Sequence, residues 1–178
     1  MKLKNWILAA EFAAIVAIFA QLTFPVATIP LTGQTFAVGL AATVLNKKTS
    51  TWALVLYMLL GAIGLPVFAG MKGGVGVILG PTGGFIVGFI FNTLLTGAWL
   101  EKFGHTVVHG IIANLLGAAV TLFFGTLWLW LALQTNFAAA FQAGFVMWLI
   151  PGIIKGVAAA LIGLAVRRAL VQAKLLEA

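Results

Sequence analysis

Long runs of apolar residues, separated by short polar or glycine- and proline-rich breaks, dominate this chain. Six runs are distinct, at residues 6–24, 34–46, 51–68, 84–100, within 106–133, and at 142–166. A helix needs about 20 mostly apolar residues to cross the hydrocarbon core of a bilayer. The pattern predicts an all-α, polytopic membrane protein with six transmembrane helices, folded as one domain over residues 1–178.

Two of these runs differ in length from a simple crossing. The second, at residues 34–46, is short for a full span. We expect it to borrow residues from the turn segment before it or to form a tilted, partly buried helix. The fifth is long enough for a tilted helix with an excursion at Gly125.

The composition agrees with a membrane protein. Of the 178 residues, 63% are hydrophobic and only 7% are charged, whereas an average soluble domain has about 25% charged residues. Six crossings use nearly the whole length, which leaves no room for a second, soluble domain. The first run follows Lys2 and Lys4, but it is too long for a signal peptide, contains Glu11 and precedes no A-x-A site. We therefore expect it to be a retained first helix.

The basic residues stand in ones and twos between apolar runs, as in the cytoplasmic loops of membrane proteins. They do not form the polar cluster with aromatic residues that would indicate a nucleic-acid partner. If the N-terminus is cytoplasmic, the outer side holds only Lys72, and Lys155 lies within the membrane. The remaining basic residues all fall in cytoplasmic segments: Lys2, Lys4, Lys47, Lys48, Lys102, Arg167, Arg168 and Lys174. This bias predicts that both termini are cytoplasmic.

Lys155 is the clearest candidate for a functional residue, because a charge inside the bilayer core is expensive to bury. It precedes Arg167 by about 18 Å of helix, at ~1.5 Å per residue, so it cannot easily reach the inner surface. The carboxylates of the chain are Glu11, Glu101 and Glu177, and the topology places them near the cytoplasmic side. We expect an anionic ligand group to bind Lys155, with a buried carbonyl or carboxylate as the alternative partner.

The segment at residues 64–84 is rich in glycine yet hardly polar. A flexible linker in water would carry serine, asparagine or charge. We therefore expect this segment to fold back against the protein, with its backbone close to other groups. Its Lys72 is either a solvated lysine or a second cation at an outward-facing pocket, where two lysines would suit a carboxylate.

Catalytic chemistry finds little support in the sequence. Ser50 is the single serine and cysteine is absent, so no nucleophilic arrangement can be assembled. The chain has no G-x-x-x-x-G-K-[ST] motif and hence no P-loop of its own. His105 and His109 have the spacing to share a metal ion, but they lack a third ligand, so we expect a polar pair at the membrane interface. We predict neither an enzyme nor a metal or cofactor site.

Glu11 lies near the start of the first run, where the helix dipole favours a carboxylate. The alternative is a proton relay in a stand-alone carrier driven by protons. Small residues at i and i+4 let helices approach closely. The alanines around Glu11 therefore predict a packing surface for another subunit, namely Ala9, Ala10, Ala13, Ala14 and Ala17.

Residues 29–38 (IPLTGQTFAV), 60–70 (LGAIGLPVFAG) and 80–85 (GPTGGF) form a set of motifs with a characteristic order and spacing. Together with residues 125–129 and 151–155, they resemble the BioY family. These proteins are the substrate-binding (S) components of energy-coupling factor (ECF) biotin transporters. The resemblance covers nearly the whole chain and implies a six-helix subunit of the bacterial plasma membrane. Biotin would lie in a pocket near the outer face, under the loop between the third and fourth helices.

The resemblance also implies partners. An S component captures the substrate, and import requires a transmembrane coupling protein and two cytoplasmic ATPase subunits. The missing P-loop is in keeping with this division of labour. The A-x-x-x-A pattern of the first run matches the surface by which the family docks on the coupling protein.

The polar binding residues carry over one by one. Gln34, with Thr32, matches a polar position after the first outer loop and would bond the polar head of the ligand. Lys72 lies where the loop of the family places a polar pocket residue. Lys155 matches a sixth-helix lysine that is expected to meet the ligand carboxylate.

The apolar part of the ligand would pack against aromatic side chains, as is usual in small-molecule pockets. Phe85, which matches an aromatic residue after the Gly-Gly pair, and Trp148 are the expected contacts. Family members often carry an acidic residue for the ureido ring where this chain has Gly152. Lipoate, a similar acid without that ring, is therefore the alternative substrate.

Overall fold

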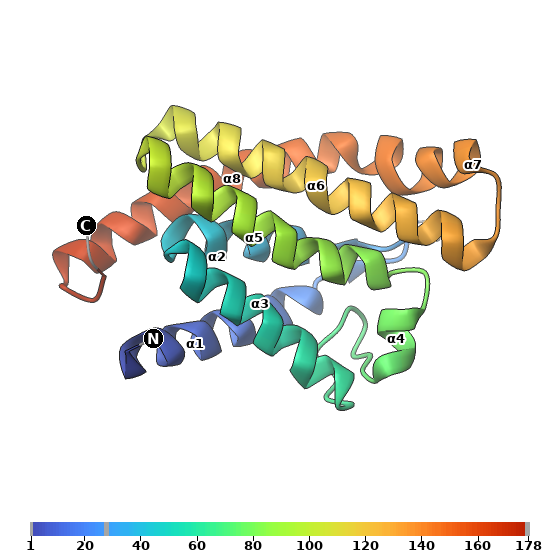
Figure 1. Ribbon diagram of the computed structural model, residues 1–178, viewed down its shortest axis with the longest axis horizontal. Coiled ribbons are helices and arrows are strands. Elements are labelled where there is room, and N and C mark those ends of the chain that lie inside the picture. Colours follow the sequence, from blue (N-terminus) through green and yellow to red (C-terminus); the bar gives the residue numbers. More distant parts are fainter. Residues whose placement is uncertain (1, 27–28, 177–178) are drawn as a thin grey trace.

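The computed structural model, which describes residues 2–26 and 29–176, is built almost entirely of helices (Figure 1). The long helices are α1 (Leu3–Ala20), α2 (Gln34–Val44), α3 (Lys47–Ala62), α5 (Gly83–Phe103), α6 (Val107–Leu133) and α8 (Met147–Gln172). Shorter elements are α4 (Val75–Leu79), α7 (Phe137–Phe141) and a π-helical turn, Gln142–Val146. Between α1 and α2, β1 (Thr23–Phe24) pairs antiparallel with β2 (Leu31–Thr32). Apart from this short pairing, the predicted all-α class is confirmed.

Helix α2 lies in the middle of the bundle. It packs against α8, α5 and α1, with α1 and α3 on one side and α5, α6 and α8 on the other (Figure 1). At its end, Arg167 Nη1 donates a hydrogen bond of 2.8 Å to the carbonyl of Val44. Most of its side chains are buried, namely Gln34, Ala37, Val38, Ala41, Ala42, Thr43 and Val44.

The two ends of the chain lie at one end of the bundle, which we call the terminal end, and α4 and α7 lie at the opposite end, the α4 end (Figure 1). Lys4 Nζ donates a hydrogen bond of 3.2 Å to the carbonyl of Lys174, which joins α1 to the segment that follows α8 at the terminal end.

Among the described residues, four helical stretches are long and apolar enough to cross a membrane: α1, α5, α6 and the continuous stretch Phe137–Gln172. The protein is therefore a multi-pass membrane protein. Helix α2 has 11 residues and α3 has 16, about 16 and 24 Å at ~1.5 Å per residue, against a hydrocarbon core of about 30 Å. Two of the six predicted spans thus correspond to helices shorter than the core, and the short second helix was expected.

The prediction that the third run is helical as far as residue 68 is wrong, because α3 ends at Ala62. Gly64 adopts a φ of 103°, and Pro66 follows it, so the chain cannot continue the helix. The error arose because the apolar residues continue without a break into the next segment.

The predicted excursion at Gly125 is also wrong, since α6 runs through this residue without interruption. A Cβ at position 125 would overlap the ring of Phe85 on α5. The glycine therefore serves the close packing of α5 on α6 and does not break the helix.

The sixth run begins earlier than predicted, at Phe137, where the Asn136 side chain accepts a hydrogen bond of 2.7 Å from the Ala139 amide. The π-helical turn leads directly into α8, and Pro151 lies inside that helix. Such irregular turns are frequent at functional sites, and this one precedes the part of α8 that faces the cavity described below.

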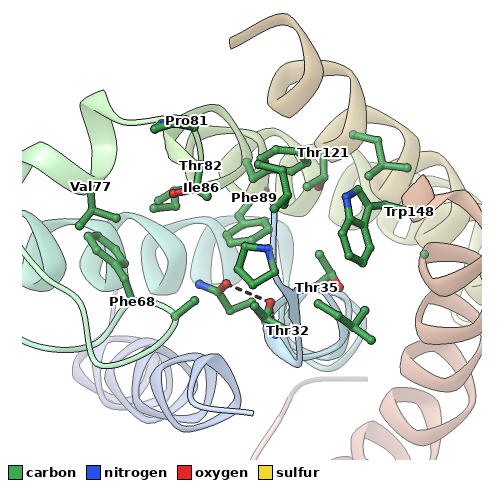
Figure 2. A pocket seen from close by; sticks show the side chains of 18 of the residues that line it. Thr32, Thr35, Phe68, Val77, Pro81, Thr82, Ile86, Phe89, Thr121 and Trp148 are labelled. Atoms are coloured by element: carbon green, nitrogen blue, oxygen red, sulfur yellow. Dashed lines mark hydrogen bonds between the residues drawn. The ribbon is translucent and has the colours of Figure 1, made fainter. Parts of the chain in front are cut away.

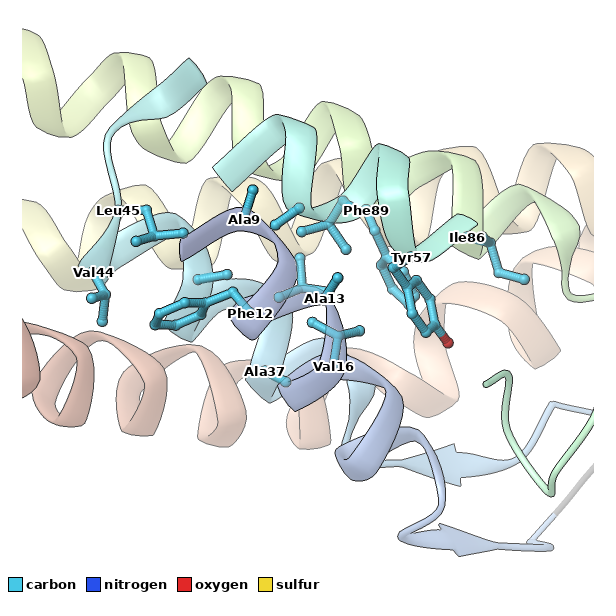
Figure 3. Close-up of a cluster of buried hydrophobic side chains, with 14 of the residues drawn as sticks. Ala9, Phe12, Ala13, Val16, Ala37, Val44, Leu45, Tyr57, Ile86 and Phe89 are labelled. Atoms are coloured by element: carbon cyan, nitrogen blue, oxygen red, sulfur yellow. The ribbon is translucent and has the colours of Figure 1, made fainter. Parts of the chain in front are cut away.

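A cluster of buried apolar side chains fixes α1 to the rest of the bundle (Figure 3). The α1 members that Figure 3 labels are Ala9, Phe12, Ala13 and Val16, and they pack with side chains of α2, α3 and α5 that include Ala37, Val44, Tyr57 and Phe89. One face of α1 is thus part of the core of the chain.

Candidate ligand-binding site

A cavity of about 390 Å³ lies at the α4 end, enclosed by α2, α5, α6, α8 and the segment at residues 63–82. Its volume is typical of small-molecule pockets, which measure about 300–1,000 Å³. Phe68 and Val77 lie on one side and Trp148 on the opposite side (Figure 2). Most of the wall is apolar and includes Ile29, Leu31, Phe68, Val77, Phe85, Ile86, Phe89, Leu122 and Trp148.

The polar side chains gather where β2 meets α2. We call the group Thr32, Gln34, Thr35 and Lys155 the polar pole of the cavity. Gln34 is 6% exposed, and its Nε2 donates to the hydroxyl of Tyr57 at 2.6 Å. The Thr32 hydroxyl donates to Gln34 Oε1 at 3.0 Å (Figure 2). Because an amide has two N–H donors, Gln34 keeps one donor for a ligand.

Lys155 reaches the polar pole from α8. Its Nζ donates to the carbonyl of Thr32 at 2.7 Å and to the hydroxyl of Thr35 at 3.2 Å. The described residues place no carboxylate within ion-pairing distance of Lys155. An ammonium group has three donors, so one remains for a ligand atom. The backbone carbonyl named as an alternative partner of Lys155 is present, but it does not neutralise the charge.

All six predicted binding residues line this one cavity: Thr32, Gln34, Lys72, Phe85, Trp148 and Lys155. Lys72 is exposed, whereas Phe85 and Trp148 are buried, at 8% and 7% exposure. Gln34 and Lys155 both contact Thr32, Gln34 through the Thr32 hydroxyl and Lys155 through the Thr32 carbonyl, so the two side chains lie on the same side of the cavity.

Three residues of the site were missed in the sequence. Thr35 lies next to Gln34 and orients Lys155. Tyr57 is the single tyrosine of the chain, and a hydroxyl inside an apolar run was a usable signal for it. Phe68 belongs to one of the quoted motifs, but only the fold shows that its ring turns inward.

We call residues 63–82 the cover segment. As expected, it folds back against the protein, where Phe68, Ala69 and Lys72 join the cavity wall. The Phe68 ring is 1% exposed and meets the Tyr57 ring edge-on, with centroids 5.5 Å apart. It lies directly over Gly61, where any side chain would overlap the ring.

Gly152 also lines the cavity. A Cβ added there would have Leu122 as its nearest heavy atom, at 3.9 Å. The cavity therefore has room for a larger side chain at the position where family members often carry an acid.

The alanines of α1 fall on two faces. Ala9 and Ala13 are 0% and 2% exposed and pack inside the chain (Figure 3), and Ala17 is partly buried. Only Ala10 and Ala14 are exposed. The predicted partner surface is corrected accordingly, because two of its five residues belong to the core of this chain.

Glu11 lies farther into its helix than the sequence indicated. Helix α1 begins at Leu3, so Glu11 is about 12 Å from its start at ~1.5 Å per residue. The first turn contains no acidic residue, so the dipole does not explain this carboxylate. Glu11 is exposed and is not among the residues that line the cavity.

His105 and His109 lie at the terminal end, between α5 and α6 and in the first turn of α6. Burial lowers the pKa of His105, and the nearby Arg167 cation lowers it further. The described residues contain no group of three or more His, Asp or Glu side chains that would hold a metal ion.

Fold and site together define a class: a multi-pass helical membrane protein with a small-molecule cavity near one end and a cation at its polar pole. The sequence profile of the BioY family matches residues 1–172. The chain is 40% identical over 169 residues to the biotin transporter BioY2 of Lactococcus lactis subsp. cremoris, covering 95% of this chain and 93% of the relative. It is 37% identical to the biotin transporter BioY of Thermotoga maritima, over 93% and 97% of the two chains.

A crystal structure of the S component for biotin from an ECF-type ABC transporter has the same fold. The TM-score is 0.85 at 27% identity, over 94% of this chain and 92% of that one. The chain belongs to the BioY family.

Proposed function

We propose that this protein binds biotin and is the substrate-capture subunit of an ECF-type importer. The observation that carries the proposal is the polar pole, where Lys155 and Gln34 each keep an unused donor beside an apolar cavity. The similar proteins named as biotin transporters support the choice of substrate. The protein acts by binding and performs no chemistry on the ligand.

The ligand carboxylate binds at the polar pole. Lys155 supplies the charge, and Gln34 and Thr35 supply further donors, since charge-assisted hydrogen bonds to a carboxylate are strong. Gln34 thus belongs to the carboxylate site in this proposal. The aliphatic part of the ligand lies along Phe85 and Trp148, and Lys72 adds positive charge at the exposed rim.

A binding titration tests this function. Purified protein in detergent is titrated with biotin, biotin amide and lipoate by calorimetry. We expect biotin to bind most tightly, because it is a carboxylate whose bicyclic ring fills the wide apolar cavity. Biotin amide should bind at least about tenfold more weakly, since the ion pair is lost. Tight binding of lipoate with no heat from biotin would refute the choice of substrate while sparing the fold.

For the orientation we propose six crossings, with the short helices α2 and α3 counted as spans and both termini in the cytoplasm. The two ends of the chain lie together, which agrees with an even number of crossings. Lys2, Lys4, Lys48 and Arg167 surround one depression at the terminal end, and the cavity lies at the other end. Basic residues collect on the cytoplasmic side of membrane proteins, so the cavity faces outward.

For the energy source we propose a transmembrane coupling protein and two ATPase subunits, with the coupling protein docked on α1. The exposed pair Ala10 and Ala14 is the contact surface, since small residues at i and i+4 permit close approach of helices. The absence of a P-loop motif in the sequence supports an external energy source.

Replacing Ala10 by leucine tests this docking surface. Copurification with the coupling protein of the same organism should fall by about tenfold, because a large side chain prevents close helix approach. Biotin binding by the free subunit should not change, since Ala10 lies outside the cavity. Ala165→Leu, at an exposed alanine of α8, is the matched control, and equal copurification of the two variants would place the docking surface elsewhere.

A further inference from the structure

Gln21, at the end of α1, joins this helix to the cover segment through both ends of its side-chain amide. Its Oε1 accepts a hydrogen bond of 2.8 Å from the backbone amide of Met71. Its Nε2 donates to the carbonyl of Phe68 at 3.2 Å and to the carbonyl of Ala17, on α1 itself, at 2.9 Å. Its Nε2 also lies 3.4 Å from the carbonyl of Val67, so one side chain binds the cover segment at three points and anchors it to a helix of the core.

The part of the cover segment that Gln21 holds is a tight and partly strained turn. The Phe68 amide donates to the carbonyl of Lys72 at 2.9 Å. Met71, between them, adopts a φ of 58°, a left-handed conformation that is unfavourable for residues other than glycine. The bond from the Met71 amide to Gln21 therefore holds in place a conformation that the chain would otherwise tend to leave.

This turn positions one wall of the cavity. Phe68 and Lys72, at its two ends, both line the cavity. The Phe68 ring packs edge-on against Tyr57, and the Tyr57 hydroxyl accepts the hydrogen bond from Gln34. A displacement of the turn would therefore open the wall and also disturb the polar pole.

We propose that Gln21 is a positioning residue that keeps the cover segment closed over the bound ligand and so sets the rate at which the ligand leaves. Gln21 does not line the cavity, so it acts through Phe68 and Met71. The inference rests on the proposed function, because it takes biotin as the ligand.

The test is the dissociation rate of radiolabelled biotin, chased with unlabelled biotin, from wild type, Gln21→Leu and Gln21→Glu. Gln21→Leu removes all the bonds and should speed dissociation by about tenfold or more, since each hydrogen bond contributes modestly to a closed state. The association rate should change by less than about threefold, because the polar pole is intact. Gln21→Glu keeps an acceptor for Met71 but loses the donor to Phe68, so its rate should lie between the two.

Gln172→Leu, at an exposed glutamine on the last turn of α8, controls for the loss of a surface amide and should match wild type. Hydrogen exchange of the Met71 amide gives a readout that does not depend on the ligand, and it should be faster in Gln21→Leu. A wild-type dissociation rate in both Gln21 variants, or a wild-type exchange rate of the Met71 amide in Gln21→Leu, would overturn the proposal.

If wild-type protein fails to bind biotin, the proposed function fails, and unchanged exchange at Met71 would separately overturn the role of Gln21. If Gln21→Leu does not fold, the dissociation rate of biotin from Gln21→Glu tests the proposal. A rate faster than that of wild type supports it, and the wild-type rate overturns it.

Discussion

Replacing Lys155 by methionine, a neutral side chain of similar length, is expected to lower the affinity for biotin by roughly 100- to 4,000-fold. Removing one partner of a buried ion pair costs about 3–5 kcal/mol, and ~1.4 kcal/mol corresponds to a factor of ten. The affinity for biotin amide, which carries no charge to pair with Lys155, should fall far less in this variant. Calorimetric titration of both ligands against both proteins measures the difference.

The ligand-free stability of this variant separates binding from folding. In the unbound protein Lys155 is a half-buried cation whose observed hydrogen-bond acceptors are neutral, Thr32 and Thr35. Its removal should leave the thermal midpoint unchanged or raise it, because a buried charge without a counter-ion is costly. Lys48→Met, at an exposed lysine of the terminal end, is the matched control and should bind biotin normally. Equal losses for the acid and the amide would show that the polar pole does not receive the carboxylate.

Introducing leucine at Gly125 is expected to abolish biotin binding and to lower the thermal midpoint. The ring of Phe85 occupies the space where the new side chain would stand. Either α5 and α6 separate or Phe85 turns into the cavity. Overpacking of this kind typically costs about 1–3 kcal/mol. Thermal unfolding in detergent and biotin titration measure the two effects.

A second substitution tests this explanation. Phe85→Ala in the Gly125→Leu background removes the ring that causes the clash, so the midpoint of the double variant should lie above that of Gly125→Leu. Such non-additivity is the signature of residues in contact. Ala119→Leu, at an exposed position of the same helix, should change neither stability nor binding. A double variant no more stable than Gly125→Leu would mean that the glycine is required for another reason.

The membrane class and several residues that line the cavity could be predicted from the sequence because their cause is local. A lysine far from either surface of a bilayer is costly to bury, whatever the rest of the chain does. This cost singled out Lys155 as a candidate functional residue. A glycine-rich segment with few polar residues is expected to fold back against the protein, and the cover segment does. The four longest spans followed from apolar length alone.

What could not be predicted depends on contacts between distant segments. The two alanine stripes of α1 are equivalent in the sequence, and only the packing of α2 and α3 buries Ala9 and Ala13 and leaves Ala10 and Ala14 outside. Gln21 looks like an ordinary polar residue at the end of a helix until Phe68 and Met71 are placed beside it. From the sequence, Gly125 was interpreted as a break in a helix. In the structure, the Phe85 ring occupies the space that a side chain at position 125 would fill.

The short central helix α2 has a consequence for biosynthesis. Eleven residues are too few for stable insertion on their own, and a short isolated helix is marginal. Most of the contacts that bury α2 come from α5 and α8, and its last turn is completed by Arg167, which is more than one hundred residues later in the chain. The ribosome therefore finishes nearly the whole protein before α2 has its final surroundings, so the polar pole that α2 carries forms among the last parts of the molecule.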